Sequence, residues 1–339
     1  MKRIRFGIAA MRFALVLSVL LCGAMNRAHA DVLIASDSYA TGSNPAAGQY
    51  VAGTSIASQT GLVTTGFANG GYTAGSVNTS NFISSSTGLT NAADGATAST
   101  GSVAWIATSS SDTATKSLAH NLTSIINESS STTYWVSELM KNTGNQTTTT
   151  GSILSGFANA TSVTLGTGTA FLQGVYFGFA DNSGAANEAD LVARYRDTSG
   201  GKVVAQSVLV NGANNATADT TYLVVAKITI NSGLTPDTVN FWINPTDLSS
   251  QAALTSTALT TGTLNTLSYQ GGSSGDFTRL NYVETNWDGG AFFDEARLGT
   301  TLASIVPTAV PEPSSVILLG AGSIVGLVVR SRRRALRVA

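Results

Sequence analysis

Strand-length runs of alternating apolar residues, in a chain with almost no helical periodicity, most constrain what this protein can fold into. From about 31 to 310 the sequence is rich in Ser, Thr, Gly, Ala and Asn, a composition that disfavours helix. In the run 221–230 every second residue is apolar, and 239–244 alternates in the same way. A period of two is typical of half-buried antiparallel strands rather than of fully buried parallel ones.

Further segments share this strand character. Together with the two runs above they are 32–35, 134–140, 171–179, 190–196, 202–210, 277–283 and 292–298. Such strands, joined by polar loops without alternating helices, bury their apolar sides best as two facing sheets. The predicted fold class is therefore all-β, an antiparallel β sandwich of jelly-roll type. The segment 79–133 is dense in Ser and Thr, which predicts either a loosely ordered insertion or short edge strands.

The first 30 residues predict export. An apolar run over 13–25 follows a basic start and ends at Ala28-His29-Ala30, just before Asp31; the basic residues are Lys2, Arg3, Arg5 and Arg12. These are the parts of a signal peptide handled by the Sec export machinery, with cleavage between Ala30 and Asp31. Cys22, the only cysteine, lies inside the apolar run, so a body starting at Asp31 has no disulfide.

The last residues form a second membrane signal. After Pro311-Glu312-Pro313 come an apolar stretch, 314–329, and a basic tail, 330–339, whose first arginines are Arg330, Arg332, Arg333 and Arg334. The apolar stretch predicts a transmembrane helix, and the arginines behind it predict a cytoplasmic tail with everything before it outside. The chain therefore divides into a signal peptide (1–30), a body (31–305) and a linker with a membrane signal (306–339).

The C-terminal pattern resembles a known sorting signal. Val310-Pro311-Glu312-Pro313-Ser314, a short glycine-containing apolar helix and an arginine cluster are similar to the PEP-CTERM sorting signal. The resemblance implies that exosortase, a membrane peptidase, processes the chain near Pro311, Glu312 and Pro313, in bacteria that make exopolysaccharide. It further implies transient anchoring by the C-terminal helix and a final place in the cell envelope, at the outer surface or in the extracellular matrix of a Gram-negative-type bacterium. The alternative is a plain single-pass membrane anchor.

The body carries a second resemblance. Segments 222–228, 237–245 and 293–301 are similar to the closing strands of concanavalin A-like (laminin-G-like) jelly-roll domains of bacterial surface proteins. Asp37-Ser38-Tyr39 and the turn 70–75 would then be the opening strand and loop. Ala296 departs from that pattern, because a larger aliphatic residue is expected there.

Once both ends are removed, the charge balance becomes strongly acidic. The chain has 18 Lys and Arg and 19 Asp and Glu, of which five basic residues lie in 1–30, five in 330–339 and one acidic residue, Glu312, beyond the body. That leaves 8 basic against 18 acidic residues, a net charge near −10. Nucleic acid is therefore excluded as a partner, since it needs a positive surface.

Catalytic patterns are scarce. His120 is the only histidine of the body and lies in a polar context, so we expect it at the surface, and neither a histidine-based triad nor a multi-histidine zinc site can form. Glycanases of the concanavalin type use two carboxylates in the spacing E-x-D-x-x-E, which is absent. The acidic cluster nearest to it consists of Glu284, Asp288, Asp294 and Glu295. We expect no enzymatic activity.

Candidate binding residues follow from exposed aromatics and from one misplaced carboxylate. Trp287 beside Asn286, and Trp242 on the polar side of its strand, are candidate glycan contacts, or else Trp287 covers the core. Asp294 shares its strand phase with apolar residues, so it is a calcium ligand together with Asp288 or an acceptor of backbone N–H groups from a nearby loop.

Three functions are compatible with these sequence features. The first is a non-catalytic structural or adhesive body associated with exopolysaccharide. The second is a calcium-dependent carbohydrate-binding module, and the third is a glycoside hydrolase or lyase.

Overall fold

The computed structural model describes most of the predicted body. The described residues are 31–44, 48–59, 64–68, 71–74, 82–91, 101–105, 116–126, 131–143, 151–158, 174–180, 189–197, 204–209, 216–231, 237–254, 265–269, 277–285, 287 and 289–306. Contacts divide the chain into two compact units, Met1–Val306 and Pro307–Ala339. The predicted signal peptide, the sorting motif and both predicted terminal helices lie outside the described residues. No helix in the described part is long and apolar enough to cross a membrane.

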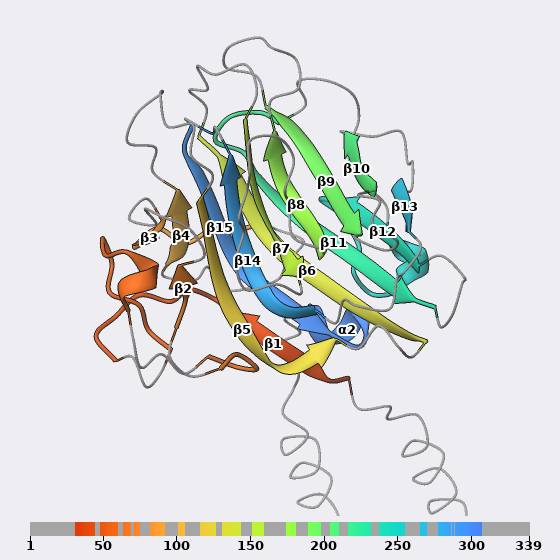
Figure 1. The fold of residues 1–339 in the computed structure, drawn as a ribbon, viewed down its shortest axis with the longest axis horizontal. Helices are drawn as coiled ribbons and strands as arrows, with labels where there is room; N and C mark the ends of the chain where they lie inside the picture. Colours follow the sequence, from red (N-terminus) through yellow and green to blue (C-terminus); the bar gives the residue numbers. More distant parts are fainter. Residues whose placement is uncertain are drawn as a thin grey trace, which may run out of the picture. The chain divides into compact units, whose positions relative to one another are not determined.

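Two antiparallel sheets form the body, as predicted (Figure 1). One sheet runs in the order β13 (Asn265–Tyr269), β12 (Asp237–Ile243), β11 (Thr221–Ile230), β6 (Thr132–Asn142), β15 (Ala291–Gly299), β4 (Ser102–Trp105), β3 (Phe82–Ser85), with β1 (Leu33–Asp37) also paired to β15. The other runs in the order β10 (Val204–Leu209), β9 (Asp190–Asp197), β8 (Gly174–Ala180), β7 (Ser152–Ala158), β14 (Phe277–Thr285), β5 (Lys116–Ile126), β2 (Thr73–Ala74). The fold is an all-β, jelly-roll type sandwich.

The remaining described elements are short. They are two single-turn 3₁₀ helices, η2 (Ile56–Ser58) and η4 (Gln251–Ala253), and one α-helical turn, α2 (Leu302–Ile305). The side chain of Thr301 accepts the backbone N–H of Ser304, and the Ser304 hydroxyl accepts the N–H of Thr301, which caps α2. The first and last strands lie side by side, because β1 pairs with β15. The first and last described strands are therefore neighbours in the same sheet.

Every predicted strand overlaps an observed one, but others were missed. The segment 79–133 contains β3, β4 and the 11-residue β5, and the last of these is an interior strand that pairs with β14 on one side and β2 on the other. Of the two alternatives for this segment, short edge strands describe β3, which ends its sheet, but not the long interior β5. The polar composition of the segment hid these strands, because Ser occupies buried strand positions such as Ser102 and Ser117.

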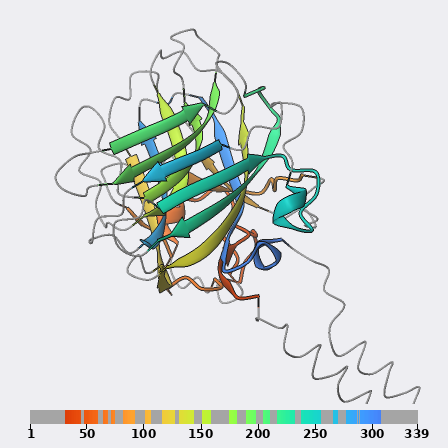
Figure 2. The same ribbon diagram turned by 90° about the vertical axis from the view of Figure 1, so that its right-hand side faces the viewer.

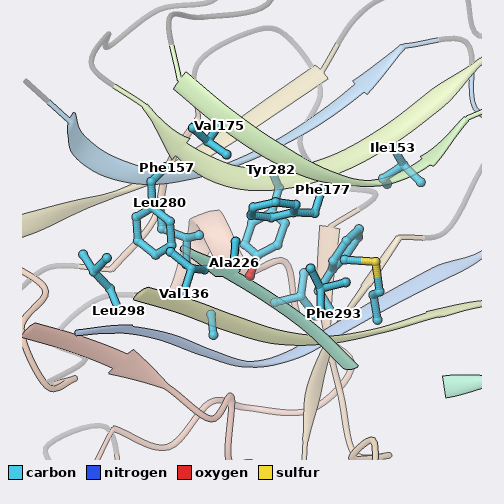
Figure 3. Packing of buried hydrophobic residues seen from close by; sticks show 14 of the residues in the cluster. Val136, Ile153, Phe157, Val175, Phe177, Ala226, Leu280, Tyr282, Phe293 and Leu298 are labelled. Carbon is cyan, nitrogen blue, oxygen red and sulfur yellow. The ribbon is translucent and has the colours of Figure 1, made fainter. Parts of the chain in front are cut away.

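The main hydrophobic core fills the space between the two sheets. Figure 3 shows Phe157, Val175 and Leu280 of one sheet facing Val136 and Leu298 of the other. The alternation predicted for the run 221–230 is confirmed, since its even-numbered residues from Tyr222 to Ile230 are all buried in this core. Figure 2, turned by 90°, shows the strands as two stacked layers.

A β-bulge in β15 overturns the predicted phase of Asp294. The register of β15 against β6 shifts between Asp294 and Arg297, and Glu295 within the shift has a φ of 53°. Phe293 before the bulge and Ala296 after it therefore both point into the main core. Asp294 pairs in register with Leu139, which packs on the opposite face of the eight-stranded sheet. A strict period of two cannot predict this, because the extra residue changes the face.

The outer face of the eight-stranded sheet carries a core of its own. Trp135, Leu223 and Trp242 pack there against Leu302 and Ile305 of α2. The rings of Trp135 and Trp242 are stacked, with centroids 5.9 Å apart. This face is therefore covered by the body's own apolar side chains.

Candidate functional site

The outer face of the seven-stranded sheet carries buried polar side chains that lack partners among the described residues. In β14, Leu280 and Tyr282 point into the main core, so Arg279, Asn281 and Val283 point to the outer face. Val283 belongs to a separate small apolar cluster on that face.

Two adjacent cross-strand rows, which we call the polar rows, run over this face. The first contains Asn121, Arg279, Ala158, Gly174 and Arg196, and the second contains Ala119, Asn281, Gly156, Tyr176 and Arg194. Each row takes one residue from each of β5, β14, β7, β8 and β9. For Arg194 and Arg196 only the register position is described, opposite Tyr176 and Gly174 respectively.

Asn281 and Arg279 are both buried on this face. Asn281 is 1 % exposed, and within the described part of the chain neither its Oδ1 nor its Nδ2 has a hydrogen-bond partner. Arg279 is 9 % exposed, and its buried Nε likewise has no partner among the described residues. A buried polar group without a partner costs about 1–3 kcal/mol. Other described residues with unpaired buried atoms, such as Trp287 at Nε1, lack one partner, whereas Asn281 lacks partners at both ends of its amide.

Small residues around Asn281 leave it without competing side chains from the neighbouring described strands. Its cross-strand neighbours are Ala119 and Gly156. A Cβ at Gly156 would lie 2.1 Å from the backbone oxygen of Val175 and 2.8 Å from Cδ1 of Tyr176, so only glycine fits there. The ring of Tyr176 occupies the space beside Gly156, next to Asn281.

The polar rows are open to solvent at one end and are bordered by apolar residues on one side. Asn121, beside Arg279, is exposed, so the first row opens to solvent at β5. Beyond Asn281 the next row along the strands contains Val283, Leu154 and Val192, which pack together. Asp190 is one row further on and belongs to neither polar row. Positive and neutral polar groups are thus set apart from a described carboxylate by an apolar row.

The tryptophans expected to contact glycan are buried instead. Trp287 is 2 % exposed and lies in the main core, where its ring stacks on Phe179 with centroids 6.3 Å apart. Trp242 is 5 % exposed, because Trp135 and the second core cover it. Trp287 therefore fills the core, which is the second of the two interpretations drawn from the sequence, and Trp242 is covered rather than exposed. Asn286 lies outside the described residues.

Asp294 is held by backbone N–H groups. Its Oδ2 accepts the N–H of Leu89 at 2.8 Å and its Oδ1 accepts the N–H of Glu295 at 2.8 Å, which is the second of the two interpretations drawn from the sequence. Asp288, the proposed partner in a calcium site, lies outside the described residues. Among the residues that the structure describes, no group of three or more His, Cys, Asp or Glu side chains could hold a metal ion.

Two further polar groups are buried. Arg297 donates to Oε2 of Glu295 at 2.5 Å, and both side chains are buried beside α2. The expectation that His120 lies at the surface is wrong, since β5 points it into the main core beside Phe67, with the two ring centroids 4.6 Å apart. Burial lowers the pKa of His120 to about 4, partly opposed by a hydrogen bond with the carbonyl of Ala68.

An interior polar cluster lies between the sheets. It consists of Asp37, Tyr39, Tyr50, Tyr72, Glu138 and Tyr282. Tyr50 donates its hydroxyl to Oδ2 of Asp37 at 2.5 Å, and Oε1 of Glu138 accepts hydroxyls from Ser155 at 2.9 Å and Tyr282 at 3.3 Å. Its hydroxyls form hydrogen bonds with carboxyl groups that would otherwise be costly to bury.

Burial changes the ionisation of both carboxyl groups in the cluster. It raises the pKa of Asp37 to about 6, although Tyr50 and the N–H of Tyr39 donate to it. It raises the pKa of Glu138 to about 8, against the hydrogen bonds from Ser155 and Tyr282 and with a small further rise from Asp294. Glu138 is therefore neutral in the folded protein at pH 7.

A buried ion pair anchors the segment after β14. Nζ of Lys116 lies 4.0 Å from Oε2 of Glu284 and 4.8 Å from the centre of the Trp105 ring. Oε1 of Glu284 accepts the N–H of Trp287 at 2.6 Å, and Nε1 of Trp105 donates to the Trp287 carbonyl at 3.2 Å. Glu284 therefore faces the interior and holds its own loop rather than facing a substrate.

Comparison with known protein families identifies the motif in the C-terminal segment. Residues 309–334 match the PEP-CTERM protein-sorting motif. This confirms the first resemblance drawn from the sequence. The PEP-CTERM motif marks the chain as an exported protein anchored through its C-terminus, and it implies processing by exosortase. No curated protein is detectably similar in sequence over the chain.

Solved structures with a similar architecture are distant. An endo-β-1,4-glucuronan lyase from the fungus Trichoderma reesei has a TM-score of 0.39 at 12 % identity, over 70 % of this chain and 98 % of the lyase. The calreticulin globular domain of T. cruzi has a TM-score of 0.39 at 14 % identity, over 74 % and 95 %. The Emp47p carbohydrate recognition domain has a TM-score of 0.35 at 8 % identity, over 65 % and 89 %.

Proposed function

We propose that this protein is sorted to the outer surface or extracellular matrix through its PEP-CTERM motif, and that its body holds exopolysaccharide, without cleaving it, on the polar rows. The observation that carries the second part is Asn281. An amide with both ends buried and unpaired among the described residues, next to a guanidinium whose Nε is buried and unpaired among them, is unfavourable in the free protein. Because Asn281 is itself buried, a glycan reaches it only by entering where the first row opens to solvent at Asn121; there its hydroxyls donate to Oδ1 and accept from Nδ2, which removes that cost on binding.

A binding role without turnover is supported by where the acid–base groups lie. Asp37, His120, Glu138 and Glu284 all face the space between the sheets, and the described side chains of the polar rows include no carboxylate and no imidazole. Glycoside hydrolysis needs two carboxyl groups on either side of the bond. Incubation with the host's polysaccharide should therefore release no reducing ends, as a hydrolase would, and should produce no absorbance at 235 nm, as a lyase would.

Replacing Asn281 by Leu should separate binding from folding. The strand pairings of the described body all fall within 33–299, so a protein of residues 31–306 retains both sheets. We expect Asn281→Leu to weaken binding to polysaccharide extracted from the host's matrix about tenfold or more, through loss of two buried hydrogen bonds. Its melting temperature should stay equal or rise, since an unpaired amide is removed and the leucine side chain has as many heavy atoms as the asparagine side chain it replaces.

Lys227→Gln is a suitable control for that experiment, because Lys227 lies on β11 of the other sheet. The proposal fails if Asn281→Leu binds as the unmodified protein does, measured by co-sedimentation with the polysaccharide. Loss of binding in 5 mM EDTA would instead favour a calcium-dependent carbohydrate-binding module.

Sorting is tested by intact mass. Protein recovered from the envelope and medium of its own host should begin near Asp31 and end near Pro311, Glu312 and Pro313. Replacing the three motif residues by Ala should abolish the C-terminal cut. A wild-type mass that still includes 330–339 would mean a simple membrane anchor.

A further inference from the structure

The distribution of arginine in this acidic body is uneven. Between 31 and 310 the sequence has four arginines, namely Arg194, Arg196, Arg279 and Arg297. Three of them occupy the polar rows, while Arg297 is bound to Glu295 on the other sheet. A body with 8 basic and 18 acidic residues thus places three of its arginines in two adjacent rows of one sheet.

Arg279 has no counter-charge within the described part of the body. Among the described residues no carboxylate lies within ion-pair distance of its guanidinium, and Asp190 is separated from the polar rows by the apolar row of Val192. Arginine stays protonated at neutral pH even where burial lowers its pKa, as it does here. A guanidinium that is 9 % exposed, has an unpaired buried Nε and lacks a described ion-pair partner is stabilised when an anion binds it.

From this we infer that the polysaccharide bound on the polar rows is anionic, and that Arg279 forms a paired hydrogen bond with an acidic group on one of its sugars. The inference rests on the proposed function and narrows its substrate class. Arg194 and Arg196 lie at the register positions across from Tyr176 and Gly174. Asn281 contacts the sugar hydroxyls, and the buried apolar row of Val283, Leu154 and Val192 borders the polar rows on one side. Carboxylate and sulfate groups share the geometry that a guanidinium recognises.

The test changes the glycan rather than the fold. Polysaccharide from the host's matrix is used in three forms, namely untreated, with its carboxyl groups reduced to alcohols by carbodiimide and borohydride, and with sulfate esters removed by solvolysis. We expect the unmodified protein to lose binding at least tenfold on one of the two treatments, which identifies carboxylate or sulfate as the partner. Equal binding of all three forms would overturn the inference while leaving the proposed function intact. Binding of none of them would defeat the proposed function itself.

A matched pair of variants locates the charge. Arg279→Gln should weaken binding of the untreated glycan about tenfold and reduce its sensitivity to salt, whereas Lys227→Gln, which removes the same charge from the other sheet, should change neither. Against the carboxyl-reduced or desulfated glycan that no longer binds well, Arg279→Gln should have little further effect. An equal loss for Arg279→Gln and Lys227→Gln would contradict the inference, because the effect would then come from net charge alone.

Discussion

Replacing Lys116 by Met should reduce the free energy of unfolding by about 3–5 kcal/mol, because it leaves the Glu284 carboxylate buried without its cation. The two side chains are 1 % and 0 % exposed, so water cannot compensate for the lost partner. Glu284 also receives the N–H of Trp287, so an unstable carboxylate here loosens the connection from β14 to β15. Urea denaturation of the body measures the loss.

Two further variants make this prediction specific. Lys116→Met combined with Glu284→Gln should recover a large part of the stability, since neither charge is then buried. Lys141 pairs with Asp219 at 3.4 Å, but their side chains are 23 % and 71 % exposed, so Lys141→Met should cost less than about 1 kcal/mol. Equal losses for Lys116→Met and Lys141→Met would show that the buried pair has no special role.

The stability of the body should fall as the pH rises from 6.5 to 8, by about 2 kcal/mol. The cause is Glu138, whose pKa is about 8 in the folded protein against an ordinary value of 4.5. Below pH 4.5 it is protonated in both the folded and the unfolded state and costs nothing. At higher pH the unfolded chain releases the proton while the folded protein keeps it, so folding loses stability until the pH passes 8.

Two other buried groups titrate below this window and oppose each other. The raised pKa of Asp37 lowers stability as the pH rises from 3.8 to about 6. The lowered pKa of His120 raises stability as the pH rises from about 4 to 6.5. Both effects fade above pH 6.5 and partly cancel, and by about pH 7.5 Glu138 is the main one of these three that still binds a proton differently in the two states.

Glu138→Gln isolates the effect, since an amide preserves the acceptor for Ser155 and Tyr282 and cannot ionise. We expect the stability of the variant to change little between pH 6.5 and 8 and to exceed that of the wild type at pH 8. Asp247→Asn, at a fully exposed carboxyl, should keep the wild-type slope. A wild-type profile without slope, or the same slope in Glu138→Gln, would mean that Glu138 is not the titrating group. Thermal melts across the pH series provide the data.

The architecture could be predicted because apolar alternation survives wherever one face of a strand is buried. Tyr222, Val224 and Ala226 illustrate this, since each enters the core that the period of two assigns to it. β5 was missed because its inward residues include Lys116 and His120, which look like surface residues in the sequence. Both enter the core only because Glu284 and a ring of aromatic residues are there to receive them. No local pattern encodes partners supplied by distant strands.

The candidate site could likewise be predicted only in part from the sequence. Trp287 and Trp242 suggested a sugar platform by their residue type, yet large aromatics are also the most effective core fillers, and here both are buried. Arg279 and Asn281 alternate with Leu280 and Tyr282, so their place on an outer face was readable from the sequence. Their lack of described partners was not, because it depends on Ala119 and Gly156 in neighbouring strands.

The most direct measurement is a ¹⁵N–¹H spectrum of the body, 31–306, recorded while oligosaccharides released from the host's polysaccharide are added. The Asn281 side-chain amide is assigned by its absence in Asn281→Leu. We expect this amide and Nε–H of Arg279 to shift with saturation, while the indole signals of Trp135 and Trp242 stay in place. Shifts confined to the indole of Trp287, with Asn281 unchanged, would contradict glycan binding on the polar rows. They would instead favour glycan binding at Trp287, as first predicted from the sequence.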